Sequence, residues 1–185
     1  MSNEKENLKN NAMDEKKKVN NKIEWLKSFV FAAIIAFLLM KFIVFFGYVP
    51  TGSMIPTINE GDRIVVWKCF RYLDWENRGL TYGDIVVFTS NNERVGEGKL
   101  LVKRVIGMGG DKISIDNGIV YRNGEKLDEP YVKNKDSFFM NEIEIPEHEI
   151  FVLGDNRIGS YDSRFWDKQT VPIENVVGEL KFLLP

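Results

Sequence analysis

Hydrophobic residues follow two different patterns along the chain. Residues 28–48 form one nearly continuous apolar run, whereas residues 1–22 before it are rich in Lys, Asn and Glu. A helix over this run is roughly 31 Å long, enough to cross the hydrocarbon core of a bilayer. The polar residues before it bury too little apolar surface to offset the entropy of ordering. We therefore predict a disordered tail over residues 1–24 and a transmembrane helix over residues 25–48.

Aromatic and charged residues at the ends of the run indicate its orientation. Trp25 and Tyr48 occupy positions typical of interfacial aromatics, and Lys41 lies near the far end, where its stem can carry the ammonium to the headgroups. Lysines gather before the run, and none follows it up to Asp62. The positive-inside rule then predicts a cytoplasmic N-terminus and an extracytoplasmic domain over residues 49–185. These flanks disfavour a buried helix of a soluble protein, and the length of the run with no A-x-A site after it disfavours a cleaved signal peptide.

Short apolar runs separated by turn residues dominate the remainder of the chain. They are rich in Val, Ile and Phe, they are bounded by Gly, Asn and Asp, and no helical period competes with them. Asn123-Gly124 is typical of a tight hairpin turn, and residues 116–118 offer a second turn. We predict a β-rich domain with a hairpin-like subdomain over residues 112–150. The expected strands cover residues 63–68, 84–88, 100–107, 112–115, 119–122, 149–154 and 176–184.

Composition narrows the possible chemistry. The formal net charge is −2, with both signs mixed, whereas a nucleic-acid-binding protein usually concentrates basic residues on one face. The single cysteine, Cys69, rules out an intrachain disulfide, and we expect it to be a small core residue. The single histidine, His148, lies in a polar turn and is a poor candidate for a Ser-His-Asp triad. No His, Cys and Asp cluster has the spacing of metal ligands, so we expect no metal and no cofactor.

Two residues are candidate catalytic groups in the absence of a histidine base. Ser53 lies where Pro50, Gly52 and Pro56 shape the backbone, so it is either a nucleophile on a formed turn or part of a spacer. A serine nucleophile needs a base, and lysine becomes one when burial lowers its pKa from about 10.4. Lys103 lies in the apolar run "LLVKRVIG", either buried as such a base or exposed on an edge strand.

A third candidate segment, residues 154–164, has the sequence "GDNRIGSYDSR". It follows a predicted strand and is dense in turn formers, as an ordinary hydrogen-bonded loop would be. Arg164 is suited to pair with Asp162, and Ser160 is suited to orient a neighbouring polar group such as the lysine.

Four blocks of the sequence together resemble a known family. They are "SMIPT" (53–57), "GDIVVF" (83–88), "KRVIGMGGD" (103–111) and "GDNRIGSYDSR" (154–164). They match, in order, bacterial type I signal peptidases, which are membrane-anchored Ser-Lys proteases that remove signal peptides from exported proteins. The single N-terminal span resembles the short Gram-positive form of the family. The resemblance covers most of residues 25–184.

The resemblance implies roles for individual residues. Ser53 is the expected nucleophile, Lys103 the general base, and Thr51 a side-chain oxyanion donor beside the Ser53 backbone N–H. Threonine stands where many members of the family have serine, and it keeps the hydroxyl. The supporting positions are Ser160, which orients the lysine, Asp162 and Arg164, which form an ion pair, and Arg104, which lies beside the base.

The resemblance also implies the fold, substrates and partners. The expected fold is mostly β, with coiled antiparallel sheets and a reduced second subdomain. The expected partners are the bilayer, possible secretion machinery, and signal peptides with small residues at positions −1 and −3. Apolar pockets near residues 85–88 and Val102 would suit such side chains. Other interpretations are a self-cleaving protease of the DNA-damage-repressor type, an inactive membrane-tethered β domain that binds exported chains, and a structural envelope protein. The span and the "GDNR" block disfavour the first, and the occupied catalytic positions disfavour the second.

Overall fold

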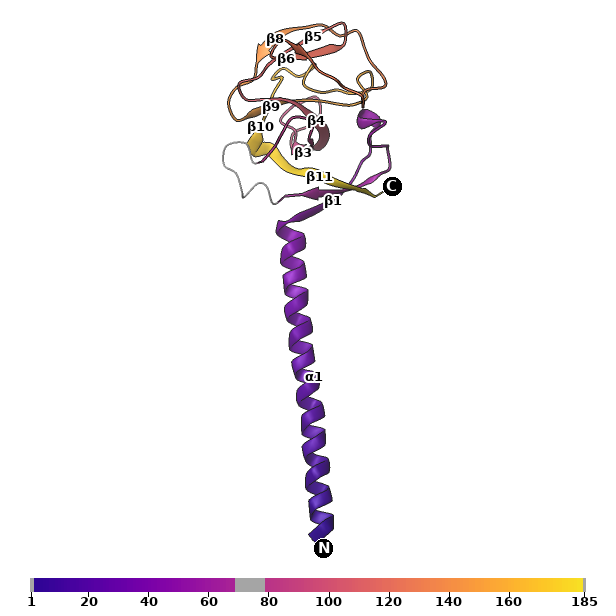
Figure 1. The fold of residues 1–185 in the computed structure, drawn as a ribbon, viewed down its shortest axis with the longest axis vertical. Coiled ribbons are helices and arrows are strands. Elements are labelled where there is room, and N and C mark those ends of the chain that lie inside the picture. Colours follow the sequence, from indigo (N-terminus) through magenta and orange to yellow (C-terminus); the bar gives the residue numbers. More distant parts are fainter. Residues whose placement is uncertain (1, 69–78, 185) are drawn as a thin grey trace. The chain divides into compact units, whose positions relative to one another are not determined.

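The computed structural model describes residues 2–68 and 79–184, and of residues 2–20 it describes the backbone alone (Figure 1). The chain divides into two compact units, Met1–Phe42 and Ile43–Pro185. Cys69, expected to be a core residue, lies outside the described residues.

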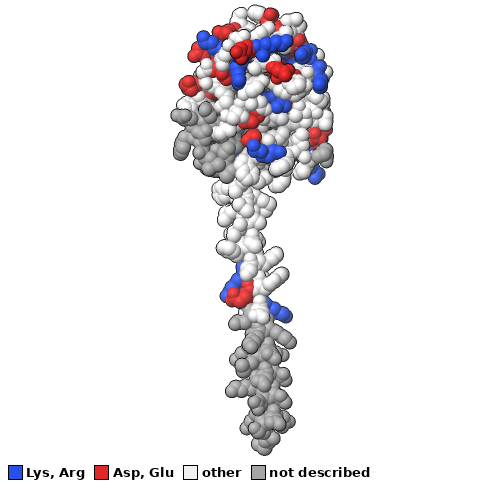
Figure 2. All heavy atoms as spheres, in the orientation of Figure 1, with Lys and Arg blue, Asp and Glu red and all other residues white. Residues whose placement is uncertain are grey.

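The first unit consists of one long helix, α1 (Ser2–Phe42). Its part from Asn21 to Phe42 spans 22 residues, its most apolar 18-residue stretch has a mean hydropathy of 2.0, and none of that stretch is buried. That length and composition suffice to cross a membrane. Figure 2 shows this stretch as mostly uncharged, with a small group of charged side chains. Lys27 and Glu24 form an ion pair at 2.9 Å.

Both boundaries expected for the N-terminal segment differ from the structure. Residues 2–24 are helical rather than disordered, and their Lys, Glu, Leu and Ala residues are good helix formers. The helix ends at Phe42 rather than at residue 48, because β1 (Val44–Tyr48) pairs antiparallel with β2 (Arg63–Trp67). Hydropathy alone does not separate an apolar strand from the last turns of an apolar helix.

Among the described residues, the strands form two antiparallel sheets. The larger sheet has the order β1-β2-β11-β3-β4-β9-β10, and the smaller has the order β7-β6-β5-β8. Register shifts where β11 and β4 meet their neighbours bend the larger sheet. The mostly β fold with curled antiparallel sheets is confirmed. The other strands are β3 (Ile85–Thr89), β4 (Leu100–Met108), β5 (Lys112–Asp116), β6 (Ile119–Arg122), β7 (Glu125–Lys126), β8 (Met140–Glu144), β9 (Glu149–Leu153), β10 (Val171–Pro172) and β11 (Val176–Leu184).

The smaller sheet is built from two tight hairpins and one returning strand. β5 and β6 are joined through Asn117 and Gly118, and β6 and β7 through Asn123 and Gly124. All four residues have positive φ, between 48° and 81°, as two-residue hairpin turns require. The turns expected from these Asn-Gly pairs are therefore confirmed. β8 completes the sheet by pairing with β5, so residues 112–144 form the subdomain.

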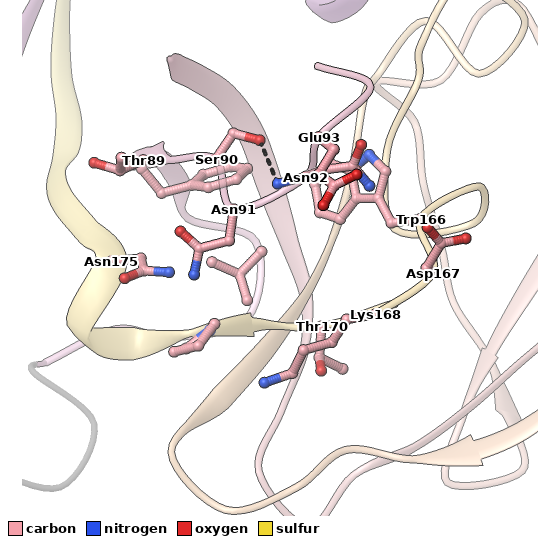
Figure 3. A pocket seen from close by; sticks show the side chains of 13 residues that line it. Thr89, Ser90, Asn91, Asn92, Glu93, Trp166, Asp167, Lys168, Thr170 and Asn175 are labelled. Carbon is pink, nitrogen blue, oxygen red and sulfur yellow. Dashed lines mark hydrogen bonds between the residues drawn. The ribbon is translucent and has the colours of Figure 1, made fainter. Parts of the chain in front are cut away.

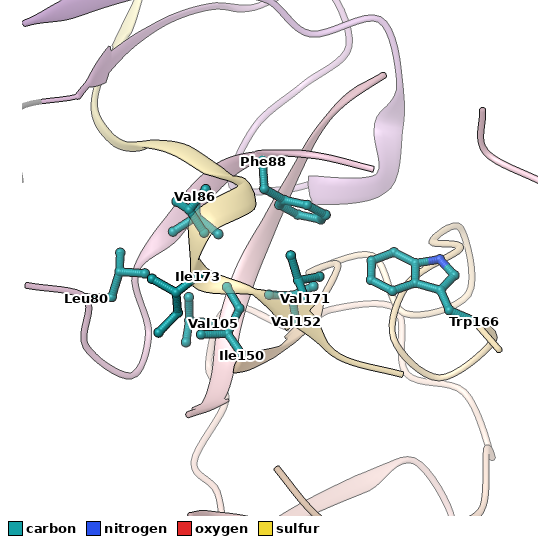
Figure 4. Packing of buried hydrophobic residues seen from close by; sticks show 10 residues of the cluster. Leu80, Val86, Phe88, Val105, Ile150, Val152, Trp166, Val171 and Ile173 are labelled. Atoms are coloured by element: carbon teal, nitrogen blue, oxygen red, sulfur yellow. The ribbon is translucent and has the colours of Figure 1, made fainter. Parts of the chain in front are cut away.

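Three clusters of buried apolar side chains hold the domain together. The cluster in Figure 4 lies on one face of the larger sheet, where Phe88 and Trp166 meet edge to face with ring centroids 6.0 Å apart. A second cluster packs the smaller sheet against Phe151 and Leu153 of β9. A third contains Met54, which is fully buried. Burial of one such side chain contributes about 1.5–3 kcal/mol, so this cluster fastens the segment that follows β1.

Candidate active site

Ser53 lies in a short 3-10 turn, η1 (Gly52–Met54), between β1 and β2. Met54 and Ile58 are fully buried, whereas Ser53 is partly exposed. Thr51, just before the turn, is extended and exposed. The segment is therefore a turn anchored in the core rather than a spacer.

Lys103 lies on β4, an interior strand between β3 and β9. Its side chain is only 3% exposed, so the interpretation of an exposed edge-strand lysine is wrong. Its Nζ lies 2.7 Å from Ser53 Oγ and donates to the backbone carbonyl of Val102 at 3.1 Å. Two candidates fifty positions apart in sequence are thus in direct contact.

Burial lowers the pKa of Lys103 from 10.5 to about 8. The carboxylates of Asp162 and Asp155 oppose this shift, whereas the guanidinium of Arg164 adds to it. With a pKa near 8, about one Lys103 in ten is neutral at pH 7. In that form the Ser53 hydroxyl can donate its proton to the Nζ lone pair, which is what a general base requires.

A small pocket of about 130 Å³ opens beside the serine and the lysine. Ser53, Lys103 and Thr51 line it together with side chains from β1, β3 and β4. The apolar part includes Val87 and Val102, within the regions expected to form substrate pockets. A small apolar group placed there would lie next to the Ser53 side chain. The remaining lining residues are Phe45, Gly47, Tyr48, Val49, Pro50, Ile64, Leu100 and Leu101.

An ion pair connects β4 to the loop after β9. Arg104 donates to both carboxylate oxygens of Asp155, at 2.8 and 2.6 Å. Thr57 Oγ1 donates to the same carboxylate at 2.5 Å, and the Arg104 guanidinium lies 3.9 Å from the centre of the Tyr131 ring. Arg104, the residue after Lys103, therefore ties β4 to the loop after β9. Asp155 and Thr57 were assigned no role from sequence, although both fall within blocks that carried the resemblance.

Arg164 and Asp162 form a buried ion pair. The guanidinium donates to the two carboxylate oxygens at 2.7 and 2.9 Å, and it also pairs with Asp136. Asp162 in turn accepts a hydrogen bond from the Gly154 N–H at 2.9 Å. The pair thus holds the loop after β9 in shape, and its charges lie close enough to influence the pKa of Lys103.

Ser160 does not make the contact with Lys103 that the resemblance implies. Its Oγ is buried and has no hydrogen-bond partner among the described residues, so the expected contact with Lys103 is not present. A Cβ added at Gly154 would lie 2.3 Å from Ser160 Oγ and 2.5 Å from the Ser53 carbonyl oxygen. Glycine at position 154 is therefore what allows the two serines to approach the same backbone.

A second pocket, of about 210 Å³, lies between the loop after β3 and the segment around Trp166 (Figure 3). None of the expected site residues lines it. Trp166 is 6% exposed, and its Nε1 has no hydrogen-bond partner among the described residues. His148 is exposed in a turn with φ of 61°. Ser53 and Lys103 therefore lie at the smaller pocket and not at this one.

A serine hydroxyl in contact with a buried lysine defines a class of hydrolase whose base is not histidine. Within this class, the chain belongs to the signal peptidase family, peptidase S26, which matches residues 22–184. It is 34% identical over 155 residues to the probable signal peptidase I-1 of Synechocystis, covering 82% of this chain and 76% of that protein. It is 33% identical over 178 residues to signal peptidase I T of Bacillus subtilis, covering 91% and 88%. A crystal structure of a signal peptidase I from Enterococcus faecalis aligns with 55% of this chain and 97% of that chain, with 28% identity and a TM-score of 0.45.

Family membership confirms the resemblance found in the four sequence blocks. The chain is accordingly a serine endopeptidase of the signal peptidase type. The repressor-type protease and the inactive binding domain are not favoured, since the relatives named above are signal peptidases matched over most of their length.

Proposed function

We propose that this protein cleaves signal peptides from exported preproteins, with Ser53 as nucleophile and Lys103 as general base. The observation that carries the proposal is the 2.7 Å contact between Ser53 Oγ and the buried Lys103 Nζ. The lowered pKa of Lys103 supports it, because a neutral amine is then present near neutral pH.

The geometry supports an acyl-enzyme mechanism. Ser53 Oγ attacks the scissile carbonyl carbon while its proton passes to Lys103 Nζ. The negative charge on the carbonyl oxygen is stabilised by the Thr51 hydroxyl and the Ser53 backbone N–H. The C–N bond then breaks, and the Lys103 ammonium gives its proton to the leaving amine. Water then attacks the ester carbonyl as its proton passes to Lys103, the bond from the acyl carbon to Ser53 Oγ breaks, and Lys103 returns the proton to Ser53 Oγ.

The pocket beside the dyad supports a preference for small side chains. Its volume of about 130 Å³ and its lining by Val87, Val102 and Ile64 suit a small apolar group. An alanine at the −1 position of a signal peptide has that size and character. Larger side chains would need the surrounding strands to move.

The apolar segment of α1 supports a membrane-anchored enzyme with its N-terminus in the cytoplasm. Its hydropathy suits a span, and the lysines that precede it favour that orientation. One face of β1, β2 and β11 is also apolar and exposed, and it includes Phe46, Tyr48 and Phe182. Exposed apolar patches of this kind suit contact with lipid. The secretion machinery is a further partner that the family resemblance implies.

Cleavage of a preprotein by the detergent-solubilised full chain tests the assignment. Ser53→Ala and Lys103→Ala should each abolish release of the signal peptide, because they remove the nucleophile and the base. The measurement is the appearance of mature protein on a gel over time. Full activity in either variant would refute the assignment of the dyad.

A matched control separates lost chemistry from lost folding. Ser114 lies on β5 in the smaller sheet, away from the pocket that Ser53 lines. Ser114→Ala should cleave at the wild-type rate, and all the variants should give the same circular dichroism spectrum. A comparable loss in Ser114→Ala would point to a folding defect instead.

A further inference from the structure

Asn156 makes two hydrogen bonds to the backbone of the turn that carries Ser53. Its side-chain Nδ2 donates to the Gly52 carbonyl oxygen at 3.0 Å. Its backbone N–H donates to the Ser53 carbonyl oxygen at 3.1 Å. One residue of the loop after β9 therefore holds two consecutive carbonyl groups of the turn.

The side-chain amide of Asn156 is itself held in one orientation. Its Oδ1 accepts hydrogen bonds from the Gly159 N–H at 3.3 Å and from Asn134 Nδ2 at 3.2 Å. With the oxygen end engaged by two donors, the nitrogen end faces Gly52. The contact to the Gly52 carbonyl is thus part of a short chain of hydrogen bonds from Asn134 through Asn156 to the turn.

Holding the Gly52 carbonyl also fixes the Ser53 N–H. The peptide bond between Gly52 and Ser53 is trans, and in a planar trans peptide the C=O and the following N–H point in opposite directions. Asn156 does not line the pocket, whereas Ser53 does. With the carbonyl turned toward Asn156, the Ser53 N–H points away from Asn156, and we infer that it faces the pocket that Ser53 lines, where the proposed oxyanion forms.

The Gly52–Ser53 peptide needs such an anchor. Glycine restricts the backbone least, so a turn with glycine directly before the nucleophile has several accessible orientations of this peptide. The turn's own hydrogen bond to the Gly52 carbonyl, from the Ile55 N–H, is long at 3.3 Å. The 3.0 Å contact from Asn156 is the shorter of the two.

We propose that Asn156 is a positioning residue that aims the Ser53 backbone N–H at the developing oxyanion. The inference rests on the proposed role of Ser53 as nucleophile. Asn156 is not among the residues that line the pocket, and Lys103 hydrogen-bonds to Ser53 and Val102 instead. In this proposal Asn156 acts through the orientation of one peptide group. Its loss should impair the chemical step while leaving substrate binding and the base unchanged.

Steady-state kinetics on a signal-peptide substrate, with the full chain in detergent, tests the proposal. Asn156→Ala should lower kcat roughly 10- to 100-fold, somewhat less than the 10²- to 10³-fold typical of removing an oxyanion donor outright. KM should stay within about threefold, and the midpoint of the pH–rate profile should not move. Thr51→Val supplies the reference for outright loss of a donor.

Two further variants make the result decisive. Asn134→Ala removes a hydrogen bond to Asn156 but leaves the contact with Gly52, so it should retain most of kcat. Asn156→Asp keeps the size and the acceptor of the side chain but lacks the donor, so it should lower kcat as Asn156→Ala does. It therefore tests the lost hydrogen bond separately from any loss of stability that alanine causes. A kcat within threefold of wild type in both Asn156 variants overturns the inference, as does a defect confined to KM.

The same assay separates this inference from the proposed function. If Ser53→Ala retains cleavage, the assignment of the nucleophile fails and the inference fails with it. If Ser53→Ala is inactive while both Asn156 variants keep full kcat, the positioning role alone is wrong. A shifted pH midpoint in Asn156→Ala would instead place its effect on the base.

Discussion

Lys103 is 3% exposed on an interior strand, in surroundings that disfavour the ammonium relative to the amine. Few lysines tolerate such a position, because a charged group loses its hydration on burial. The nearby charges of Asp162 and Arg164 act in opposite directions, so burial decides the net shift. In the proposed mechanism, this one residue therefore governs the pH dependence of cleavage, and its lowered pKa also makes folding depend on pH.

Cleavage should rise with pH through the pKa of Lys103. The base works only when neutral, so kcat/KM should be half-maximal near pH 8. Below that pH it should fall about tenfold for each further unit of pH. Initial rates on a short signal-peptide substrate between pH 6 and 10 measure this. A midpoint near 10.5 would show that the lysine is hydrated in the active enzyme.

Replacing Lys103 with methionine should abolish cleavage and stabilise the fold. The folded pKa of about 8 lies below the unfolded value of 10.5, so below pH 8 the native state holds a proton that it disfavours. The difference corresponds to about 3 kcal/mol. Lys103→Met should raise the free energy of unfolding at pH 7 by on the order of 3 kcal/mol. This gain should shrink as the pH rises from 8 to 10.5.

Urea denaturation at pH 7 and at pH 10.5 provides the measurement. Lys112→Met, on an exposed position of β5, is the control and should change the unfolding free energy by less than about 0.5 kcal/mol. A destabilised Lys103→Met protein at pH 7 would contradict the assigned burial cost.

Among the elements, the strands were the most predictable from sequence. All seven expected strands are present within two residues of their expected ends, since alternation and Asn-Gly turns act locally. β1 was mistaken for helix, because its identity depends on pairing with β2, fifteen or more residues later. The contacts of Asp155 and Asn156 depend on packing between distant loops, which no local pattern encodes.

The loop around Trp166 is predicted to contribute stability without taking part in chemistry. Trp166→Ala removes a buried ring that meets Phe88 in the core, and it should lower the unfolding free energy by about 3–5 kcal/mol. Below the unfolding transition, kcat should be unchanged, because Trp166 does not line the pocket beside Ser53.

An exposed aromatic gives the matched comparison. Phe139 is 64% exposed, so Phe139→Ala should change the unfolding free energy by less than about 0.5 kcal/mol. Thermal melts of both variants in the same detergent distinguish the two positions. Equal destabilisation would mean that Trp166 is not part of the core.

At the scale of the whole molecule, the boundary between the two units predicts where the chain can be shortened. β1 forms five residue pairs with β2, and Phe45 packs against the core cluster around Met54. A protein of residues 43–185 should fold and cleave a short soluble peptide. A protein of residues 49–185 should melt at a lower temperature, because β2 loses its outer partner.

Circular dichroism melts of the two shortened proteins, together with the peptide-cleavage assay, check this. The full chain in detergent supplies the reference rate. Equal melting temperatures for the two shortened proteins would show that β1 contributes nothing to the domain, and would return residues 44–48 to the membrane segment.

The position of β1 directly after α1 also bears on how such a chain can diversify. Val44–Tyr48 is committed to the sheet, and the turn with Ser53 follows it after only three residues, Val49 to Thr51. Insertions here would break strand register or displace Ser53, whereas changes before Ile43 fall in the other of the two compact units. The helix α1 is therefore the part of the chain in which substitutions and changes of length should be tolerated. We expect the length and composition of α1 to tolerate change, while the stretch from β1 to Ser53 keeps a fixed length.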